Sequence, residues 1–250
     1  AVTAPAAQSG MARPVNTGVT PEQFGAKGDG IADDLQALQA AMQQASASGR
    51  PLELTAGAVY RFSSCLGLPS GLTIRGNGAV LLSDIQYPDL REDRVAVELM
   101  KDSDGDRAHD VRLENVTFRA ADSCQANYML RVMLARNVEF VGCTFDCEPN
   151  EWGRCAADLY GGNENIRFEG CVFRQMTSDA SGGIWVRNWT DRVESRNIRF
   201  QNCEFYKSGA DELLAVWGWG GAVRDVVLSG CSFYETQTQE ALRSEEHTSE

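Results

Sequence analysis

A nine-residue hydrophobic pattern recurs five times in the second half of the chain. Each copy begins with Asn or Asp, has apolar residues at its second and fourth positions, and ends with Phe. The copies begin, at intervals of 27, 28, 32 and 28 residues, at Asp110, Asn137, Asn165, Asn197 and Asp225. Apolar residues that alternate with variable ones are typical of a strand, and Asn or Gly favours a turn. Each repeat therefore predicts a short strand followed by a turn.

Repeats of this length predict coils that stack on one another. One repeat cannot bury its apolar face alone, whereas coils stacked at the strand spacing of about 4.8 Å bury a continuous column. The predicted fold is an all-β solenoid with repeats over about residues 110–242.

Cysteine occupies the seventh position of four repeats, which predicts a column of buried thiols. These residues are Cys143, Cys171, Cys203 and Cys231. A thiol packs as a small hydrophobic group, and the alternative, metal or redox chemistry, lacks the Cys and His spacing of a zinc site. Cys147 and Cys155 bracket a short insertion, where either two thiols or a disulfide would fit, the disulfide being expected in an exported protein.

An amphipathic helix is predicted before the repeats. Asp33 with Gln36 three residues later forms a capping-box pattern, and Gly49 marks the end of the helix. The apolar positions at helical spacing are Leu35, Leu38, Ala41, Met42 and Ala45. Such a helix covers the unpaired strand edges of a first coil, so we expect a cap at residues 19–62 of a single domain at residues 19–242.

Two motifs resemble the opening of a known superfamily. The segment Phe24-Gly25-Ala26-Lys27-Gly28-Asp29-Gly30, followed by Asp33-Asp34, and the later segment Leu72-Thr73-Ile74-Arg75-Gly76-Asn77-Gly78 closely resemble the start of the pectate-lyase-like right-handed parallel β-helices. That superfamily includes polygalacturonases, rhamnogalacturonases, certain glucanases and phage tailspike depolymerases. The resemblance covers residues 19–242 and implies a right-handed parallel β-helix, with an N-terminal capping α-helix, that acts on a polysaccharide. The sequence departs from the polygalacturonase pattern, because it contains no Asn-Thr-Asp, Gly-His-Gly or Arg-Ile-Lys.

Charge and composition exclude several classes of function. The formal charge of −12 disfavours nucleic acid as a partner, since such binding is driven by phosphate neutralisation. The apolar runs are too short to span a membrane, and no membrane partner is expected. The chain has two histidines, His109 and His247, which are too few to favour a multi-histidine zinc site or a mechanism that needs a histidine pair.

Paired carboxylates are the first candidates for chemistry, because a glycosidase needs two carboxyl groups beside the scissile bond. Asp179 and Asp211 each lie six residues after the closing Phe of a repeat, so we expect them on adjacent coils roughly 5 Å apart. Glu212 and Glu240 repeat this arrangement one position later. Like charges so close would raise one pKa, as a general acid requires. The alternative is that these are turn or solvent-facing residues. Asp158 is a third candidate, although an insertion blurs its alignment.

Tryptophans follow these acids along the chain. The same alignment stacks Trp185 over Trp217, and strand alternation places both of them and Arg187 on the outer face. Because exposed apolar patches mark binding sites, we predict that Trp185, Arg187, Trp217 and Trp219 bind sugar rings. The alternatives are a loop that covers these tryptophans or a protein interface.

Arg167 and Arg199 are predicted at the same outward position of adjacent coils. Two cations roughly 5 Å apart repel unless an acid or a bound anion intervenes. Glu169 and Glu204 are candidate acids, and the functional alternative is that the arginines bind uronate carboxylates. In a lyase, a basic side chain would abstract the proton beside such a carboxylate.

No metal or other cofactor is predicted. Asp29, Asp33 and Asp34 are explained by turn formation and helix capping. Asp102–Asp106 resembles a calcium loop, but its glycine is displaced and the closing glutamate is missing. Calcium stays an unsupported alternative.

Both ends of the chain are expected to be foreign or incomplete. Residues 1–18 are rich in Ala, Pro, Ser and Thr and indicate a linker or the remnant after a leader. Residues 243–250 (RSEEHTSE) match the translation of a common sequencing adapter at every position. We therefore expect a C-terminally truncated fragment.

The predicted function is a glycoside hydrolase that acts on an extracellular or cell-surface polysaccharide. The alternatives are a polysaccharide lyase acting on a uronic-acid-containing glycan, and a non-catalytic glycan-binding or scaffold solenoid of a surface or tail fibre. The expected location is secreted, periplasmic or on a virion surface, with a homotrimer if the tailspike branch applies.

Overall fold

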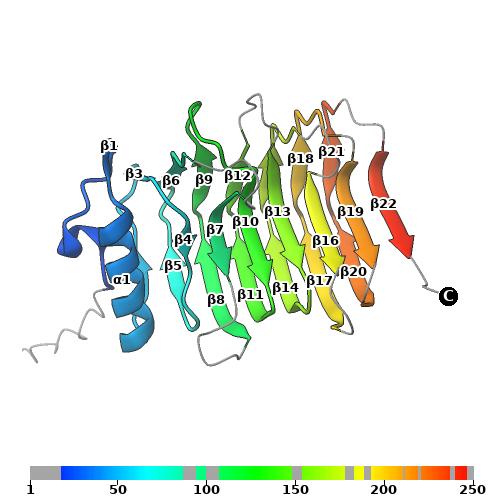
Figure 1. Cartoon of the computed structure of the whole chain (residues 1–250), viewed down its shortest axis with the longest axis horizontal. Helices are drawn as coiled ribbons and strands as arrows, with labels where there is room; N and C mark the ends of the chain where they lie inside the picture. Colours follow the sequence, from blue (N-terminus) through cyan, green and yellow to red (C-terminus); the bar gives the residue numbers. More distant parts are fainter. Residues whose placement is uncertain are drawn as a thin grey trace, which may run out of the picture.

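The computed structural model describes residues 18–86, 94–99, 107–147, 154–177, 183–188, 193–210, 212–218, 221–236 and 240–246. These residues form a solenoid in which three parallel sheets run side by side along the long axis (Figure 1). Repeated coils contribute one strand to each sheet in turn, and every named strand pair is parallel. The predicted all-β parallel β-helix with an N-terminal helix is confirmed.

The strands fall into three sheets, named here A, B and C. Sheet A contains, in spatial order, β2 (Leu52–Glu53), β5 (Thr73–Arg75), β8 (Ala108–Glu114), β11 (Ala135–Val141), β14 (Glu164–Glu169), β17 (Ser195–Gln201) and β20 (Val223–Ser229). Sheet B contains β1 (Asp29–Asp33), β3 (Val59–Phe62), β6 (Val80–Ser83), β9 (Thr117–Ala120), β12 (Thr144–Asp146), β15 (Val172–Arg174), β18 (Glu204–Tyr206) and β21 (Ser232–Tyr234). Sheet C contains β4 (Leu66–Gly67), β7 (Val95–Leu99), β10 (Tyr128–Met133), β13 (Cys155–Tyr160), β16 (Ile184–Asn188), β19 (Glu212–Gly218) and β22 (Glu240–Glu246).

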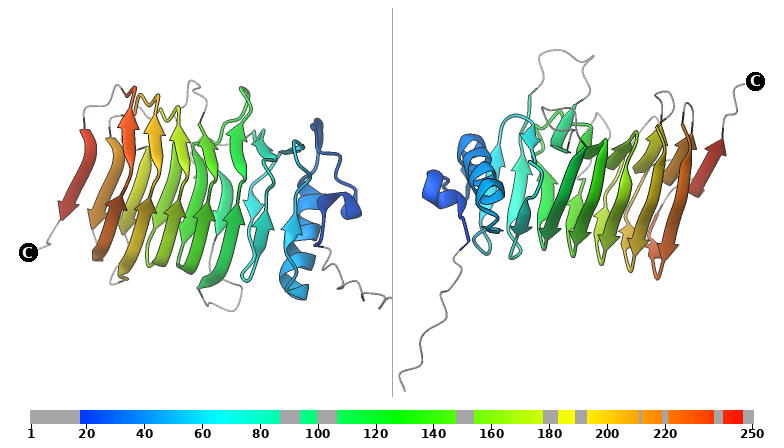
Figure 2. Two further views of the ribbon diagram at one scale, coloured as in Figure 1. Left: turned by 180° about the vertical axis from the view of Figure 1, so that it is seen from behind. Right: turned by 90° about the horizontal axis from the view of Figure 1, so that it is seen from below.

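The N-terminal end is covered by helix α1 (Leu35–Ser48), after the short 3₁₀ helix η1 (Pro21–Phe24) (Figure 2). Gly49 ends α1 in the left-handed conformation at φ 62°, as predicted. The predicted capping box is wrong, because the N-cap is Asp34 rather than Asp33. The Asp34 carboxylate instead accepts hydrogen bonds from the backbone N–H groups of Lys27 and Gly28. Asp34 therefore ties the glycine-rich turn to the start of the helix.

The repeated Asn or Asp is explained by backbone geometry. Asp110, Asn137, Asn165, Asn197 and Asp225 all have φ between 54° and 57°. Asn and Asp tolerate this left-handed region far better than bulkier residues do. Their side chains also form a ladder, in which each asparagine amide donates to the side-chain oxygen of the preceding coil at 2.6–3.0 Å. The first position of the repeat thus sets the bend and ties the coils together.

Phenylalanine and cysteine columns fill the interior between the sheets. Phe118, Phe145 and Phe173 stack at centroid distances of 4.9 Å, and a second column passes through Phe168. The predicted thiol column is confirmed: Cys143, Cys171 and Cys203 are fully buried, and Cys231 is half-buried. All eight cysteines lie within the described ranges, and all are thiols, so the disulfide considered for Cys147 and Cys155 is not formed.

No helix among the described residues is both long and apolar enough to cross a membrane. The segment Asp102–Asp106, considered for calcium, lies outside the described residues. Within the described ranges, no group of three or more His, Cys, Asp and Glu side chains is placed to hold a metal ion.

Candidate functional site

A buried ionic network lies on the outer side of sheet C. Asp158 on β13 is fully buried, and Arg131 on β10 and Arg187 on β16 approach it from the neighbouring coils. Arg187 donates to both carboxylate oxygens at 2.7 and 2.8 Å, and Arg131 donates to Oδ2 from Nε at 3.1 Å. One carboxylate therefore holds two guanidinium groups from different coils.

Burial and charge act in opposite directions on Arg187. Burial alone would lower the pKa of its guanidinium, but the Asp158 carboxylate outweighs that effect, and the pKa of Arg187 is raised above its usual value. Arg187 therefore stays charged, and its charge is already balanced inside the protein.

Nearby, burial and Glu98 raise the pKa of Cys65 to about 12, so this thiol is protonated at neutral pH and is a poor nucleophile.

Aromatic rings surround the two guanidinium groups. Arg131 lies 4.9 Å from the centroid of Tyr128, and Arg187 lies 4.7 Å from Trp185 and 5.4 Å from Tyr160. Such cation–π contacts fix the orientation of both partners. The outer side of sheet C therefore presents aromatic side chains on a rigid charged base.

Strand alternation is as predicted, but the predicted tryptophan register is wrong. Trp185 lies opposite Ala215, and Trp217 lies opposite Arg187. The two tryptophan rings nevertheless touch diagonally, with centroids 4.8 Å apart and planes inclined at 57°. Trp185 is 8% exposed, so it supports Trp217, which is half-buried, more than it offers a surface of its own.

A difference in coil length explains the error. Ile184 lies eleven positions after Phe173, whereas Leu214 lies nine positions after Phe205, although Ile184 and Leu214 are register partners. Met176 and Ser208 lie three residues after Phe173 and Phe205, and these two positions are still aligned. The Met176 carbonyl accepts hydrogen bonds from Ser208 Oγ and the Gly209 N–H. The extra residues therefore lie between Thr177 and Ile184.

The predicted acids fall close to this change in length. Asp179 and Asp211 lie outside the described residues, as does Trp219. Glu212 does lie opposite Glu240 in the strand register, as predicted. The Glu212 side chain is buried and accepts from Arg243 Nη1 at 2.8 Å.

Arg167 and Arg199 do not join this site. They are register partners on β14 and β17, as predicted, but those strands belong to sheet A rather than sheet C. Glu169 pairs with Arg167 at 2.7 Å. Glu204 does not intervene, because it lies on sheet B and accepts from the Tyr234 hydroxyl. The predicted sugar-binding residues are therefore divided between two faces of the solenoid.

Three residues of the network, Arg131, Tyr128 and Tyr160, were absent from the sequence-based candidates. They lie on sheet C strands, which the repeated phrase does not include. A signal was present in the segment Tyr128–Met133, where an arginine interrupts an apolar strand.

Comparison with known proteins identifies the family. The model of the family described as "Rhamnogalacturonase A/epimerase, pectate lyase-like" matches residues 19–232. The chain belongs to this family. A comparison with curated protein sequences gave no significant match.

Solved structures of low sequence identity share the family fold. PfbA, a surface adhesin of Streptococcus pneumoniae, matches with 16% identity and a TM-score of 0.66 over 88% of this chain and 62% of its own. The tailspike protein of Acinetobacter phage vB_ApiP_P1 matches with 16% identity and a TM-score of 0.53 over 90% of this chain and 54% of its own. The catalytic unit of a GH87 alpha-1,3-glucanase from Streptomyces thermodiastaticus matches with 14% identity and a TM-score of 0.54 over 91% of this chain and 43% of its own. The chain thus spans less than two thirds of each of these structures.

Proposed function

We propose that this β-helix acts on an extracellular or cell-surface polysaccharide, which it holds against the outer side of sheet C and hydrolyses. The observation that carries the proposal is the cluster of aromatic rings around the Arg131–Asp158–Arg187 network. Aromatic faces on a rigid base suit sugar rings, and the family includes rhamnogalacturonases by its description. A surface location agrees with the adhesin and tailspike among the similar structures.

Each residue of the face has a distinct role in this proposal. Trp217, half-buried, contacts a sugar ring, and Trp185 supports it from the adjacent coil. Arg187 positions Trp185 by lying 4.7 Å from its ring. Because Asp158 already balances the charge of Arg187, Arg187 acts by positioning rather than by binding a uronate.

The proposed acid and base are Asp179 and Asp211. Asp211 immediately precedes β19, and Asp179 lies five residues before β16. The alignment of their coils holds to Thr177 and Gly209, two residues before each acid. In this proposal one of the two carboxyl groups donates a proton to the leaving oxygen, and the other acts on the sugar or on water.

Replacing Asp179 or Asp211 with asparagine should abolish cleavage while the fold is retained. General acid–base catalysis contributes about a hundredfold or more to rate, so we expect a loss of at least that size for D179N and for D211N. The measurement is the release of new reducing ends from rhamnogalacturonan and from alpha-1,3-glucan. Asp122, on a turn between sheets B and C, provides a control, because D122N should leave the rate unchanged. Wild-type rates in both aspartate variants would exclude them as the acid and base.

The alternatives give different products. A lyase would release unsaturated ends that absorb in the ultraviolet, without a hydrolytic product. The surface adhesin among the similar structures favours a second candidate, a glycan-binding module. Saturable binding by the wild-type protein, with no cleavage of either polysaccharide, would support that candidate instead. The homotrimer expected of a tailspike stays a prediction.

A further inference from the structure

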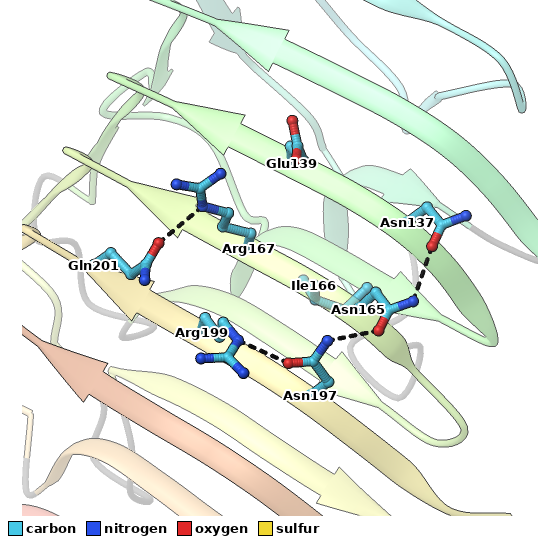
Figure 3. A pocket seen from close by; sticks show the side chains of 8 residues that line it. All are labelled: Asn137, Glu139, Asn165, Ile166, Arg167, Asn197, Arg199 and Gln201. Carbon is cyan, nitrogen blue, oxygen red and sulfur yellow. Dashed lines mark hydrogen bonds between the residues drawn. The ribbon is translucent and has the colours of Figure 1, made fainter.

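A polar groove lies on the outer side of sheet A, on a different face from the aromatic cluster (Figure 3). Its volume is about 510 Å³. Strands β11, β14 and β17 supply its lining, which consists of Asn137, Glu139, Asn165, Ile166, Arg167, Asn197, Arg199 and Gln201. The asparagine ladder forms one side, and Arg167, Gln201 and Arg199 are grouped on the other (Figure 3).

The repeats allow the charges of this groove to be compared from coil to coil. Arg112 is paired with Glu114, two residues later, at 2.6 Å, and Arg167 is paired with Glu169, also two residues later, at 2.7 Å. Arg199 occupies the same outward position on the next coil, but two residues later the chain has Gln201. The carboxylate that neutralises the other arginines is thus replaced by an amide.

Arg199 is held in place by a neutral group. Its Nε donates to Asn197 Oδ1 at 2.7 Å, and Asn197 is itself fixed by the asparagine ladder. Within the described residues, no carboxylate lies within ion-pair distance of Arg199, and its two terminal nitrogens have no hydrogen-bond acceptor. The side chain is exposed. Arg199 therefore presents two oriented donors and an uncompensated charge to the groove.

The neighbouring groups extend this donor set. Gln201 Oε1 accepts from Arg167 Nε at 2.9 Å, so the amide nitrogen of Gln201 is turned away from that bond and, in the described part of the chain, donates to no other group. Among the described lining residues, the carboxylate is that of Glu139, which forms an ion pair with Arg112 on the adjacent coil. Glu139 is thereby held toward Arg112, which it shares with Glu114.

We propose that this groove binds a carboxylate of an acidic glycan, with Arg199 as the principal contact and the amide of Gln201 as the second. A guanidinium offers parallel N–H donors that match the two oxygens of a carboxylate. Arg167 lies on the adjacent coil, roughly 4.8 Å away by strand spacing, but its charge is already paired with Glu169, which leaves Arg199 as the cation for the anion. The site is independent of the proposed cleavage on sheet C, since the two faces share no residue.

The test is isothermal titration of the full chain with a galacturonic acid trimer, compared with an uncharged galactose trimer. The wild-type protein should bind the acidic trimer and not the neutral one. R199Q should weaken binding by about tenfold or more, since hydrogen bonds to charged groups are the stronger class. Q201E, which introduces the carboxylate that Glu114 and Glu169 supply at this position of their coils, should weaken it at least as much.

R196Q is the matched control. Arg196 lies on the same strand and is also exposed, and R196Q removes the same charge, but Arg196 is already paired with Glu164 at 2.7 Å. Its affinity should stay within about twofold of wild type. Equal losses of affinity for the acidic trimer in R196Q and R199Q would show a general effect of positive charge and would overturn the proposed site. Tight binding by Q201E, or equal binding of the neutral trimer, would also overturn it. Because D179N and D211N should retain this binding, failure here is distinguishable from failure of the proposed cleavage.

Discussion

Replacing Asp158 with alanine should lower the free energy of unfolding by about 3 to 5 kcal/mol, because a buried ion pair that loses one partner leaves an uncompensated charge. Asp158 is fully buried, and the side chains of Arg131 and Arg187 are only 9% and 12% exposed. The two guanidinium groups, which lie on either side of the Asp158 coil, would then repel each other without their shared counterion. Chemical denaturation monitored by far-UV circular dichroism would measure the loss.

A charge-removal control separates this effect from ordinary surface electrostatics. Glu53 pairs with Arg75 at 2.8 Å on sheet A, where the arginine side chain is 52% exposed. E53A should cost no more than about 1 kcal/mol, as exposed pairs usually do. The double variant D158A/R187L should recover part of the loss of D158A, because it removes one of the two stranded charges. A cost for D158A as small as that for E53A would contradict the network as described.

Replacing Phe168 with alanine should lower the free energy of unfolding by about 3 to 5 kcal/mol, the usual cost of removing a buried ring. Phe168 is fully buried and stacks on Phe140 and Phe200 at 4.8 and 4.9 Å, with edge contacts to Phe145 and Phe173. The cavity would lie in mid-column, where the coils above and below hold the space open. The same denaturation measurement applies.

Phe233 is the control for the phenylalanine column. It stacks on Phe205 at 4.7 Å but is 36% exposed. Since part of that ring is already in contact with water, F233A should cost less than half as much as F168A. Similar losses in the two variants would argue against a continuous packed column.

The sequence was most informative where backbone geometry and packing restrict the choice of residue. The left-handed backbone at the first position of the repeat favours Asn or Asp, as at Asn165, and the stacked interior column requires a phenylalanine ring, as at Phe173. Both requirements fall in the repeated phrase, which covers the strands of sheets A and B. These two sheets and the thiol column were therefore predictable.

Sheet C was not predictable in the same detail. Its inward positions need only be apolar, and its outward positions vary from coil to coil, so no phrase repeats. Its register also depends on the length of the segment that enters each strand, and the two extra residues before Ile184 displaced Trp185 relative to Trp217. Arg167 and Arg199 lie on sheet A, away from Trp185 on sheet C, and the sequence alone does not state this, because position within a repeat does not by itself identify the sheet that a residue occupies.

The measurement that tests the central claim most directly is the affinity of the W217A and Y234A variants for rhamnogalacturonan and alpha-1,3-glucan. Trp217 lies on the outer side of sheet C, whereas Tyr234 is an exposed aromatic residue on sheet B, stacked on Tyr206 at 5.1 Å. If sheet C holds the polysaccharide, W217A should weaken the affinity for whichever polysaccharide the wild-type protein binds by about tenfold or more, as loss of an aromatic anchor does. Y234A should leave that affinity unchanged. An equal or greater loss in Y234A, or no binding of either polysaccharide by the wild-type protein, would contradict the account.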